Sequence, residues 1–390
     1  MFAQVLTLDT ILSRIEQNNP MLKMYDEQIT GVQNYSQMTK SWMPPKISVG
    51  KWQTPYESLN EGMWMISAEQ MIPNPSKQQA NYDYMQGMTD IESQKKFAKR
   101  NEMFAIAKQV YYSWIVLKKK HEVLVQTDSL LDYIIQVAQI RYTFNKEKLT
   151  TIYKAQADLF VIRNMETMVL GDMKMKNIEL NTLMNAVSSA EFDIDTTIQI
   201  HNYEAQANDT MLISTVRSDI KQYDAGINTA KLQQEFERTK RFPEFGVSVT
   251  HMQSTSSMPS QFSVMGMMSL PFVPWASKDY QANIQGLDNT INAINYQKQS
   301  EINEIAGEIA SLQTQIRSVK QQLNAYKEKI TPAFFNSYQS SLIGYQQNTE
   351  DLFTVLDGLK MYRMAKTDEL DQLQALLSLE VRYEKEMEIR

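Results

Sequence analysis

The sequence predicts a mainly helical protein with a small β part, built from two copies of one unit. Glycine and proline are scarce, at 12 and 11 of 390 residues, and long stretches mix apolar residues with Gln, Asn, Lys and Glu, which favours long helices. Each half also contains two short segments of alternating apolar and polar residues, which is typical of a β-hairpin. Landmarks of the first half recur in order in the second, so we expect a duplicated unit of helix, β-hairpin and long helical hairpin.

The duplication shows as four landmarks at nearly constant spacing. A Lys-x-Tyr-Asp motif around Tyr25 recurs 198 residues later, and Pro45 recurs at the same spacing as Pro243. Pro73 and Pro274 are 201 residues apart, and a Tyr-x-x-Asn motif recurs after 203 residues. A unit near 200 residues is too long for a solenoid repeat. We therefore expect a first repeat over 1–200 and a second over 201–390 that supply equivalent parts of one tube or barrel.

In the first half, a helix is expected over residues 8–42, with a break near Pro20. Pro44 and Pro45 end it, because proline cannot donate the helical hydrogen bond and restricts the residue before it. The predicted elements that follow are strands over about 46–54 and 63–72, helices over about 76–144 and 149–184 with a tip at about 145–149, and a looser bridge over 186–205.

The second half repeats this plan. Pro332 lies inside the predicted long helix that ends near Tyr345, and it should kink or interrupt that helix. The helix predicted over about 76–144 in the first half would span roughly 100 Å, and a helix of that length requires coiled-coil-like partners. The predicted elements are a helix over about 209–241, strands over about 245–252 and 262–271, a helix of roughly 60 residues, a tip at about 348–352 and a last helix to the C-terminus.

Composition excludes several functions. The net charge is −6 with acidic and basic residues well mixed, which argues against nucleic acid as a partner. The sequence has no cysteine, only three widely separated histidines, and no phosphate-binding glycine loop or serine-nucleophile motif, so we expect neither an enzyme nor a cofactor. The chain opens Met1-Phe2-Ala3-Gln4 without the basic and apolar regions of a signal peptide. It is expected to be cytosolic or to have lost such a peptide.

The strand segments favour a membrane barrel over a transmembrane helix. No stretch approaches 18 uninterrupted apolar residues, whereas barrel strands need only about ten alternating residues. Four strands cannot close a transmembrane barrel, since about eight is the minimum. Either several protomers close one barrel, or the strands form a small soluble sheet packed on helices. The long flanking helices favour a barrel set on a helical tube.

This order of elements resembles the outer-membrane efflux channel family of TolC, and most closely its heavy-metal branch. The resemblance rests on the Pro-x-apolar-x-Val start of each β-hairpin, on Pro73 and Pro274 at their ends, and on the two helical tips. Each family tip reads Gly-x-x-x-apolar-x-Asp-Val, and here the first tip runs from Asn145 to Ile152 and the second from Asn348 to Val355. Asn in place of Gly is a small change because Asn tolerates the left-handed turn conformation.

The resemblance implies a homotrimer in the outer membrane of a Gram-negative bacterium. Twelve strands would form a barrel in contact with membrane lipid, above a periplasmic helical tunnel. The tunnel tip would dock a periplasmic adaptor that links it to an inner-membrane pump, and the protein would be a passive conduit. The residues that match the docking tips are Asn145, Leu149, Asn348 and Leu352.

The gate residues of the family carry over only in part. Tyr345 matches the family's tyrosine before the second turn, and Asp357 matches the second of two acids at the narrowest point. Glu350 stands where the family has arginine, so that charge is reversed. Thr354 stands where the family has the first of those two acids, and Thr151 occupies the equivalent position of the first tip. The gate is therefore expected to close by other contacts.

The 25 methionines raise the question of a soft metal cargo. Met thioether suits Cu(I), and strand alternation puts the side chains of Met63, Met65, Met265 and Met267 on the water-facing side of the two β-hairpins. This pattern indicates export of Cu(I) or Ag(I), without a firm metal site. The alternative is that Met simply fills irregular cores.

Two other classes remain open from the sequence. One is a soluble coiled-coil structural protein with a small β head, which we call the coiled-coil rod, and the other is a periplasmic adaptor. An adaptor would carry one helical hairpin within β-rich domains, whereas here two helical hairpins alternate with two β-hairpins. A lipid-facing apolar band would make the solubility of a channel depend on detergent, whereas the coiled-coil rod would stay in solution without it.

Overall fold

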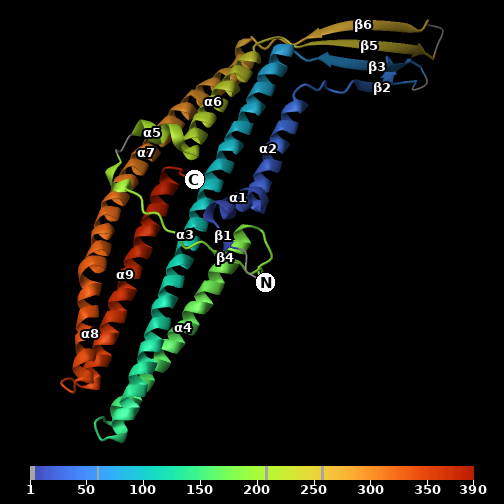
Figure 1. Cartoon of the computed structure of the whole chain (residues 1–390). Coiled ribbons are helices and arrows are strands. Elements are labelled where there is room, and N and C mark those ends of the chain that lie inside the picture. Colours follow the sequence, from blue (N-terminus) through green and yellow to red (C-terminus); the bar gives the residue numbers. More distant parts are fainter. Residues whose placement is uncertain (1–4, 59–60, 207–209, 256–258) are drawn as a thin grey trace. The chain divides into compact units, whose positions relative to one another are not determined.

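The computed structural model describes residues 5–58, 61–206, 210–255 and 259–390, and Figure 1 shows the course of the chain. The opening residues 1–4 and the predicted helix start at 209 lie outside the described residues. In the first half the elements are β1 (Val5–Leu6), α1 (Leu8–Asn18), α2 (Pro20–Met38), β2 (Lys46–Trp52), β3 (Met63–Ile72), α3 (Pro75–Thr143), α4 (Leu149–Leu183) and β4 (Asp193–Ile194).

The second half has the same order of larger elements. After a short 3₁₀ turn at Tyr203–Ala205, it contains α5 (Thr210–Val216), α6 (Ser218–Thr239), β5 (Phe245–Ser254), β6 (Gln261–Met268), α7 (Pro274–Ala325), a π-helical segment (Tyr326–Ile330), α8 (Thr331–Gln346) and α9 (Leu352–Glu386). Among the described residues, no helix is long and apolar enough to cross a membrane.

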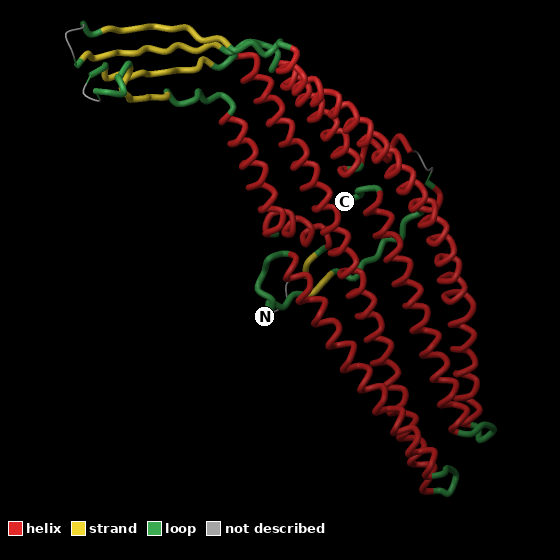
Figure 2. The backbone as a smooth tube through the Cα atoms, turned by 180° about the vertical axis from the view of Figure 1, so that it is seen from behind, coloured by secondary structure: helices red, strands yellow, loops and turns green. Residues whose placement is uncertain are grey.

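The chain divides into two compact units, and each takes segments from both halves of the sequence. The helical unit comprises Met1–Lys23, Ala98–Arg217 and Asn303–Arg390. The sheet unit comprises Met24–Phe97 and Ser218–Ile302. The four long strands form one sheet, and Figure 2 shows that most of the remaining chain is helical.

The first helix of each half is broken at an equivalent residue. Asn19 separates α1 from α2, and Arg217, 198 residues later, separates α5 from α6. Asn19 Nδ2 donates to the carbonyl of Leu183 at the end of α4 (2.8 Å), and Arg217 Nη1 donates to the carbonyl of Glu386 at the end of α9 (2.9 Å). Both contacts satisfy a carbonyl that a helix C-terminus leaves without an intrahelical donor. The continuous helix predicted up to 241 was therefore wrong at Arg217.

Prolines and left-handed residues set the other boundaries. The prediction that Pro332 interrupts the long helix is confirmed, because the π-helical segment ends at Ile330 and Pro332 lies in the first turn of α8. β2 ends at Trp52, two residues before the prediction, because Gln53 adopts a left-handed φ of 53°. β3 has its predicted bounds, β5 runs two residues further to Ser254, and β6 ends three residues early at Met268.

A glycine lets two helices of the sheet unit approach closely. A Cβ at Gly87 of α3 would lie 2.9 Å from Leu232 Cδ1 and 3.0 Å from Thr229 Oγ1, both on α6. The lone glycine of the long helix is therefore explained by packing, even though glycine costs about 1 kcal/mol relative to alanine inside a helix.

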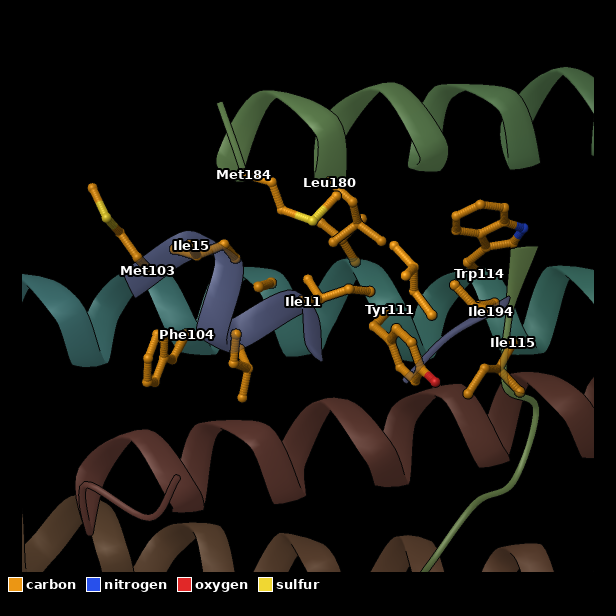
Figure 3. Close-up of a cluster of buried hydrophobic side chains, with 14 of the residues drawn as sticks. Ile11, Ile15, Met103, Phe104, Tyr111, Trp114, Ile115, Leu180, Met184 and Ile194 are labelled. Atoms are coloured by element: carbon orange, nitrogen blue, oxygen red, sulfur yellow. The ribbon is translucent and has the colours of Figure 1, made fainter. Parts of the chain in front are cut away.

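The described part of the helical unit contains two large apolar cores, besides a small cluster that includes Val116, Leu370 and Leu377. In the first, Ile11 and Ile15 of α1 pack between α3 and α4, next to Phe104, Tyr111 and Leu180 (Figure 3). The second core joins the two helical hairpins near their tips, because it contains buried side chains of α3, α4, α8 and α9. Fully burying one such aliphatic side chain stabilises the fold by about 1.5–3 kcal/mol.

The sheet is antiparallel in the order β2-β3-β5-β6. Directly opposed residues share a face, so the register of the pairs defines both faces. The apolar face carries Ile, Val, Phe and Trp side chains that are mostly exposed, and the polar face carries Ser, Thr, Gly, Lys, Glu and Met. Ser67 and Thr250 oppose each other on the polar face, and Val249 and Val264 do so on the apolar face. The predicted alternation is thus confirmed.

Candidate functional sites

The first helical tip turns at an asparagine, as predicted. Asn145 follows α3 with a left-handed φ of 57°. Its backbone N–H donates to the carbonyl of Tyr142 (2.9 Å), and the N–H of Lys146 donates to the carbonyl of Arg141 (3.0 Å). These bonds end α3 in the way that a C-terminal glycine commonly does. Lys148 precedes α4 and gives it no side-chain cap.

The second tip repeats this turn and adds a cap. Asn348 has φ 60°, and Thr349 N–H donates to the carbonyl of Gly344 (2.9 Å). Asp351 is the N-cap of α9, since its Oδ1 accepts bonds from the backbone N–H and the hydroxyl of Thr354, both 2.8 Å. These bonds from Thr354 lower the pKa of Asp351 below its usual value. The two tips therefore share a turn but differ in how the next helix begins.

Tyr345 ties the two tips together. Only 2% of its surface is exposed. Its hydroxyl donates to Glu147 Oε2 in the first tip (2.8 Å), and its carbonyl accepts from Arg141 Nη1 at the end of α3 (2.7 Å). The Arg141 guanidinium also lies 4.1 Å from the centre of the Tyr345 ring and donates to Asn348 Oδ1 (2.8 Å). We call Arg141, Glu147 and Tyr345 the tip latch.

The electrostatics of the tip latch keep the tyrosine protonated. Burial raises the pKa of Tyr345 well above its usual value, the hydrogen bond to the Glu147 carboxylate raises it further, and Arg141 opposes this. The hydroxyl therefore remains a donor at every physiological pH. Charge-assisted hydrogen bonds of this kind are about twice as strong as neutral ones.

A polar pocket of about 790 Å³ opens between the two tips. Both turns, Arg141, Glu147, Tyr345, Glu350 and Phe353 contribute to its walls. Lys154 lies 3.8 Å from the centre of the Phe353 ring, so a second cation–π contact links α4 to α9. The pocket contains charges of both signs, which suits contact with another protein chain.

Three of the five predicted gate residues, Thr151, Tyr345 and Glu350, line the pocket between the tips, whereas Thr354 and Asp357 are not among its lining residues. Tyr345 lies inside the tip latch, whereas Asp357 is exposed on α9. Glu350 is exposed, with its Cγ 2.6 Å from the position of a Cβ at Gly344. Thr354 is exposed and bonded to Asp351, and Thr151 is half-buried in the first turn of α4.

The predicted docking residues differ in exposure. Asn145 and Asn348 are exposed at the turns, and Leu149 is exposed at the start of α4. Leu352 is fully buried in the second core and cannot contact an adaptor directly in this conformation. Its neighbour Phe353 is the large exposed apolar side chain at that tip.

The sequence interpretation missed Arg141 and Glu147. The available signal was a pair of opposite charges on either side of the first turn, with Arg141 directly before Tyr142 and Glu147 two residues after Asn145. This signal is weak, because such pairs are common on solvated helix ends. Only the fold shows that both reach Tyr345, about 200 residues away in sequence.

A buried charged cluster anchors the bridge between the halves. Lys108 Nζ donates to Glu384 Oε2 (2.6 Å), and the Tyr203 hydroxyl donates to Glu384 Oε1 (2.8 Å). Glu380, one turn away on α9, is 3% exposed and accepts from the backbone N–H of His201 (3.1 Å). Burial raises the pKa of Glu380 to about 7. The segment predicted as a looser bridge is thus fixed to α9 at its end.

The predicted lumen methionines share one face of the sheet. The register places Met63, Met65, Met265 and Met267 on the polar face. In the part of the chain that is described, no three His, Cys, Asp or Glu side chains are grouped so as to hold a metal ion.

Comparison with solved structures identifies the fold. No family model and no curated protein matches the sequence. Among solved structures, the outer-membrane channel OprN superposes with a TM-score of 0.76 at 12% identity, over 97% of this chain and 89% of that one. The fold is that of the TolC-like outer-membrane factors.

Two further structures agree with this fold. The outer membrane protein VceC of Vibrio cholerae has a TM-score of 0.75 at 13% identity, over 97% of this chain and 95% of that one. CusC, whose structures concern folding and transmembrane channel formation, has a TM-score of 0.76 at 12% identity, over 99% of this chain and 93% of that one. At these identities the comparison establishes the fold.

Proposed function

We propose that this protein is the outer-membrane channel of a tripartite efflux system, and that it acts as a passive conduit. The observation that carries the proposal is the exposed apolar face of the sheet. Val249 and Val264 oppose each other on it and are 48% and 63% exposed. Its large exposed apolar side chains are Ile47, Val49, Trp64, Ile66, Ile72, Phe245, Val247, Val249, Phe262, Val264 and Met268. Patches of this kind mark contact with another protein or a membrane.

The edges of the sheet support assembly from several copies. Within the described residues, β2 and β6 each pair with a strand on one side only. Unpaired edges are templates for further strands, and closing a barrel removes them. Three copies would supply twelve strands, which is above the minimum for a transmembrane barrel. The apolar face would then contact lipid and the polar face would line the lumen.

The helical tips are proposed to dock a periplasmic adaptor that is linked to an inner-membrane pump. The exposed side chains of Asn145, Leu149, Asn348 and Phe353, together with the pocket between the tips, supply the docking surface. The tip latch holds the two helical hairpins together and thereby favours one tip conformation. Opening the tip requires breaking the bonds of Tyr345 to Arg141 and Glu147. The cargo is proposed to include Cu(I) or Ag(I).

Channel activity tests the proposal directly. The purified protein, added to planar lipid bilayers, should give stepwise conductance, and the cell fractions should place it in the outer membrane. The variant Arg141→Ala should raise the open fraction because it removes the guanidinium from the tip latch. A protein found in the soluble fraction and without conductance would favour the coiled-coil rod and contradict the channel.

A further inference from the structure

The methionines of the sheet are distributed very unevenly between its two faces. Within the described strands, the polar face carries six: Met63, Met65, Met71, Met252, Met265 and Met267. The apolar face carries Met268 and otherwise uses Ile, Val, Phe, Trp and Ala as its apolar residues. On the polar face, Trp52 is the only other large apolar side chain in these strands.

This distribution argues against methionine as a simple substitute for leucine or isoleucine. A filler residue would occur on the face that needs apolar side chains, and that face is built almost without it. Methionine instead accompanies Ser, Thr and Gly on the face that is otherwise polar. What methionine adds there, and branched aliphatic residues do not, is a polarisable thioether sulfur.

Two of these thioether side chains converge over a glycine. Met71 and Met267 lie directly opposite Gly246, one on each neighbouring strand. A Cβ built at Gly246 would be 2.6 Å from Met71 Sδ and 3.2 Å from Met267 Cε. Both side chains are half-buried. The missing Cβ therefore leaves a space above Gly246 that the ends of both side chains approach.

A second pair lies on the same face. Met65 of β3 is directly opposite Met252 of β5, so their Cβ atoms are expected about 4.5–5.5 Å apart. His251, the histidine of this hairpin, lies on the other face, opposite Ile66. The polar face thus offers mainly thioethers and hydroxyls, with the carboxylate of Glu69 and no imidazole from the described strands.

The ligand chemistry selects the ion. Soft, uncharged thioethers suit monovalent soft cations, while hard divalent ions prefer carboxylates and water. We propose that Met71 and Met267 bind Cu(I) or Ag(I) over Gly246, and that Met65 and Met252 offer the next binding position. That this site lies on the path of a cargo rests on the proposed function, whereas the binding itself does not.

Silver ion is a suitable probe, because the chain contains no cysteine that would compete as a thiolate. The detergent-purified protein is titrated with Ag(I) by calorimetry, and methionine methyl signals are followed by NMR. The double variant Met71→Leu/Met267→Leu should weaken the tightest binding at least tenfold. The matched control, Met168→Leu/Met175→Leu, removes two exposed methionines of α4 and should leave that binding unchanged.

A glycine pair tests the geometry without removing sulfur. Gly246→Ala should weaken Ag(I) binding, because the new methyl group displaces the flexible end of Met71. Gly266→Ala, on the opposite face with nothing within 4 Å of its Cβ, should bind as the wild type does. Equal Ag(I) affinity of the wild type, the Met71/Met267 double variant and Gly246→Ala would overturn the site. Ag(I) binding that depends on Met71 and Met267, in a protein that shows no conductance in lipid bilayers, would support the binding site and contradict only the channel.

Discussion

The sheet leaves its apolar side chains exposed, whereas the helical tips bury a tyrosine together with its charged partners. Val264 is 63% exposed, and Tyr345 is 2% exposed and bonded to both Arg141 and Glu147. The apolar face of the sheet would therefore gain free energy from contact with lipid or another protein chain. At the tips, in contrast, the polar groups of Tyr345 already have hydrogen-bond partners within the chain. Changes in the sheet should act on assembly, and changes in the helical unit should act on the chain's own stability.

The largest effect is expected from a charge on the apolar face. Val264→Arg should abolish the membrane-inserted form, because an arginine facing lipid near the bilayer midplane costs about 2–4 kcal/mol in each copy. Helical content should persist, since the helical unit has its own cores. Detergent extraction and circular dichroism measure the two outcomes.

The neighbouring residue provides the control. Ser263→Arg places the same charge on the polar face of the same strand, opposite Thr250. It should still be extracted in the assembled form. Equal loss of assembly in both variants would contradict the assignment of the two faces.

The second prediction concerns the buried Glu380 of the helical unit. Its pKa is raised from 4.5 to about 7 by burial, and the groups around it are Glu384, Glu204, Lys320 and His201. A raised pKa means that this carboxyl favours folding when protonated. Its contribution is full below about pH 4.5 and is lost as pH rises through 7. Stability should fall over this window by about 1.4 kcal/mol per pH unit.

The variant Glu380→Gln distinguishes the contribution of this carboxyl to the pH dependence of stability from the contributions of its neighbours. It should raise the melting temperature at pH 8 and flatten the dependence between pH 5 and 7. Its amide oxygen can still accept from the His201 N–H. Glu122→Gln, at an exposed position of α3, should keep the wild-type slope. An unchanged slope in Glu380→Gln would show that other groups cause it.

The third prediction breaks the tip latch. Arg141→Ala removes a cation–π contact and two hydrogen bonds, and bonds to charged groups contribute about 1.5–3 kcal/mol. Amide hydrogen exchange around Asn348 should accelerate. Arg141→Lys should recover only part of the protection, because lysine lacks the planar fork of donors. Unaltered exchange in Arg141→Ala would mean that the tips are held by their apolar core alone.

The smallest effect is expected at the first turn. Asn145→Ala should destabilise the tip by about 1 kcal/mol, because alanine disfavours the left-handed conformation. Asn145→Gly should be nearly neutral, since glycine adopts this conformation readily. Thermal unfolding of the two variants gives the comparison, and equal melting temperatures would argue against backbone strain at this turn.

Local patterns predicted most elements of both units. Proline placement gave the hairpin boundaries and the interruption before α8, and the alternation in β5 and β6 gave the two faces. Asparagine at both turns was interpreted correctly, because its tolerance of positive φ is a property of the residue itself. These signals are all carried by a few neighbouring residues.

The missed features depend on contacts distant in sequence. Nothing local to Arg217 marks a helix break, which is fixed by the end of α9. Glu147 looks like an ordinary charge in a turn until Tyr345 is brought against it. The side-by-side placement of β3 and β5, which brings Met71 over Gly246, likewise follows from the fold.

The mass of the membrane-extracted protein in mild detergent tests the channel most directly. After the detergent mass is subtracted, the particle should have three times the chain mass of 45.2 kDa, come from the outer-membrane fraction and aggregate when detergent is removed. A monomer or dimer that stays in solution without detergent, obtained from the soluble fraction, would contradict the channel and favour the soluble rod.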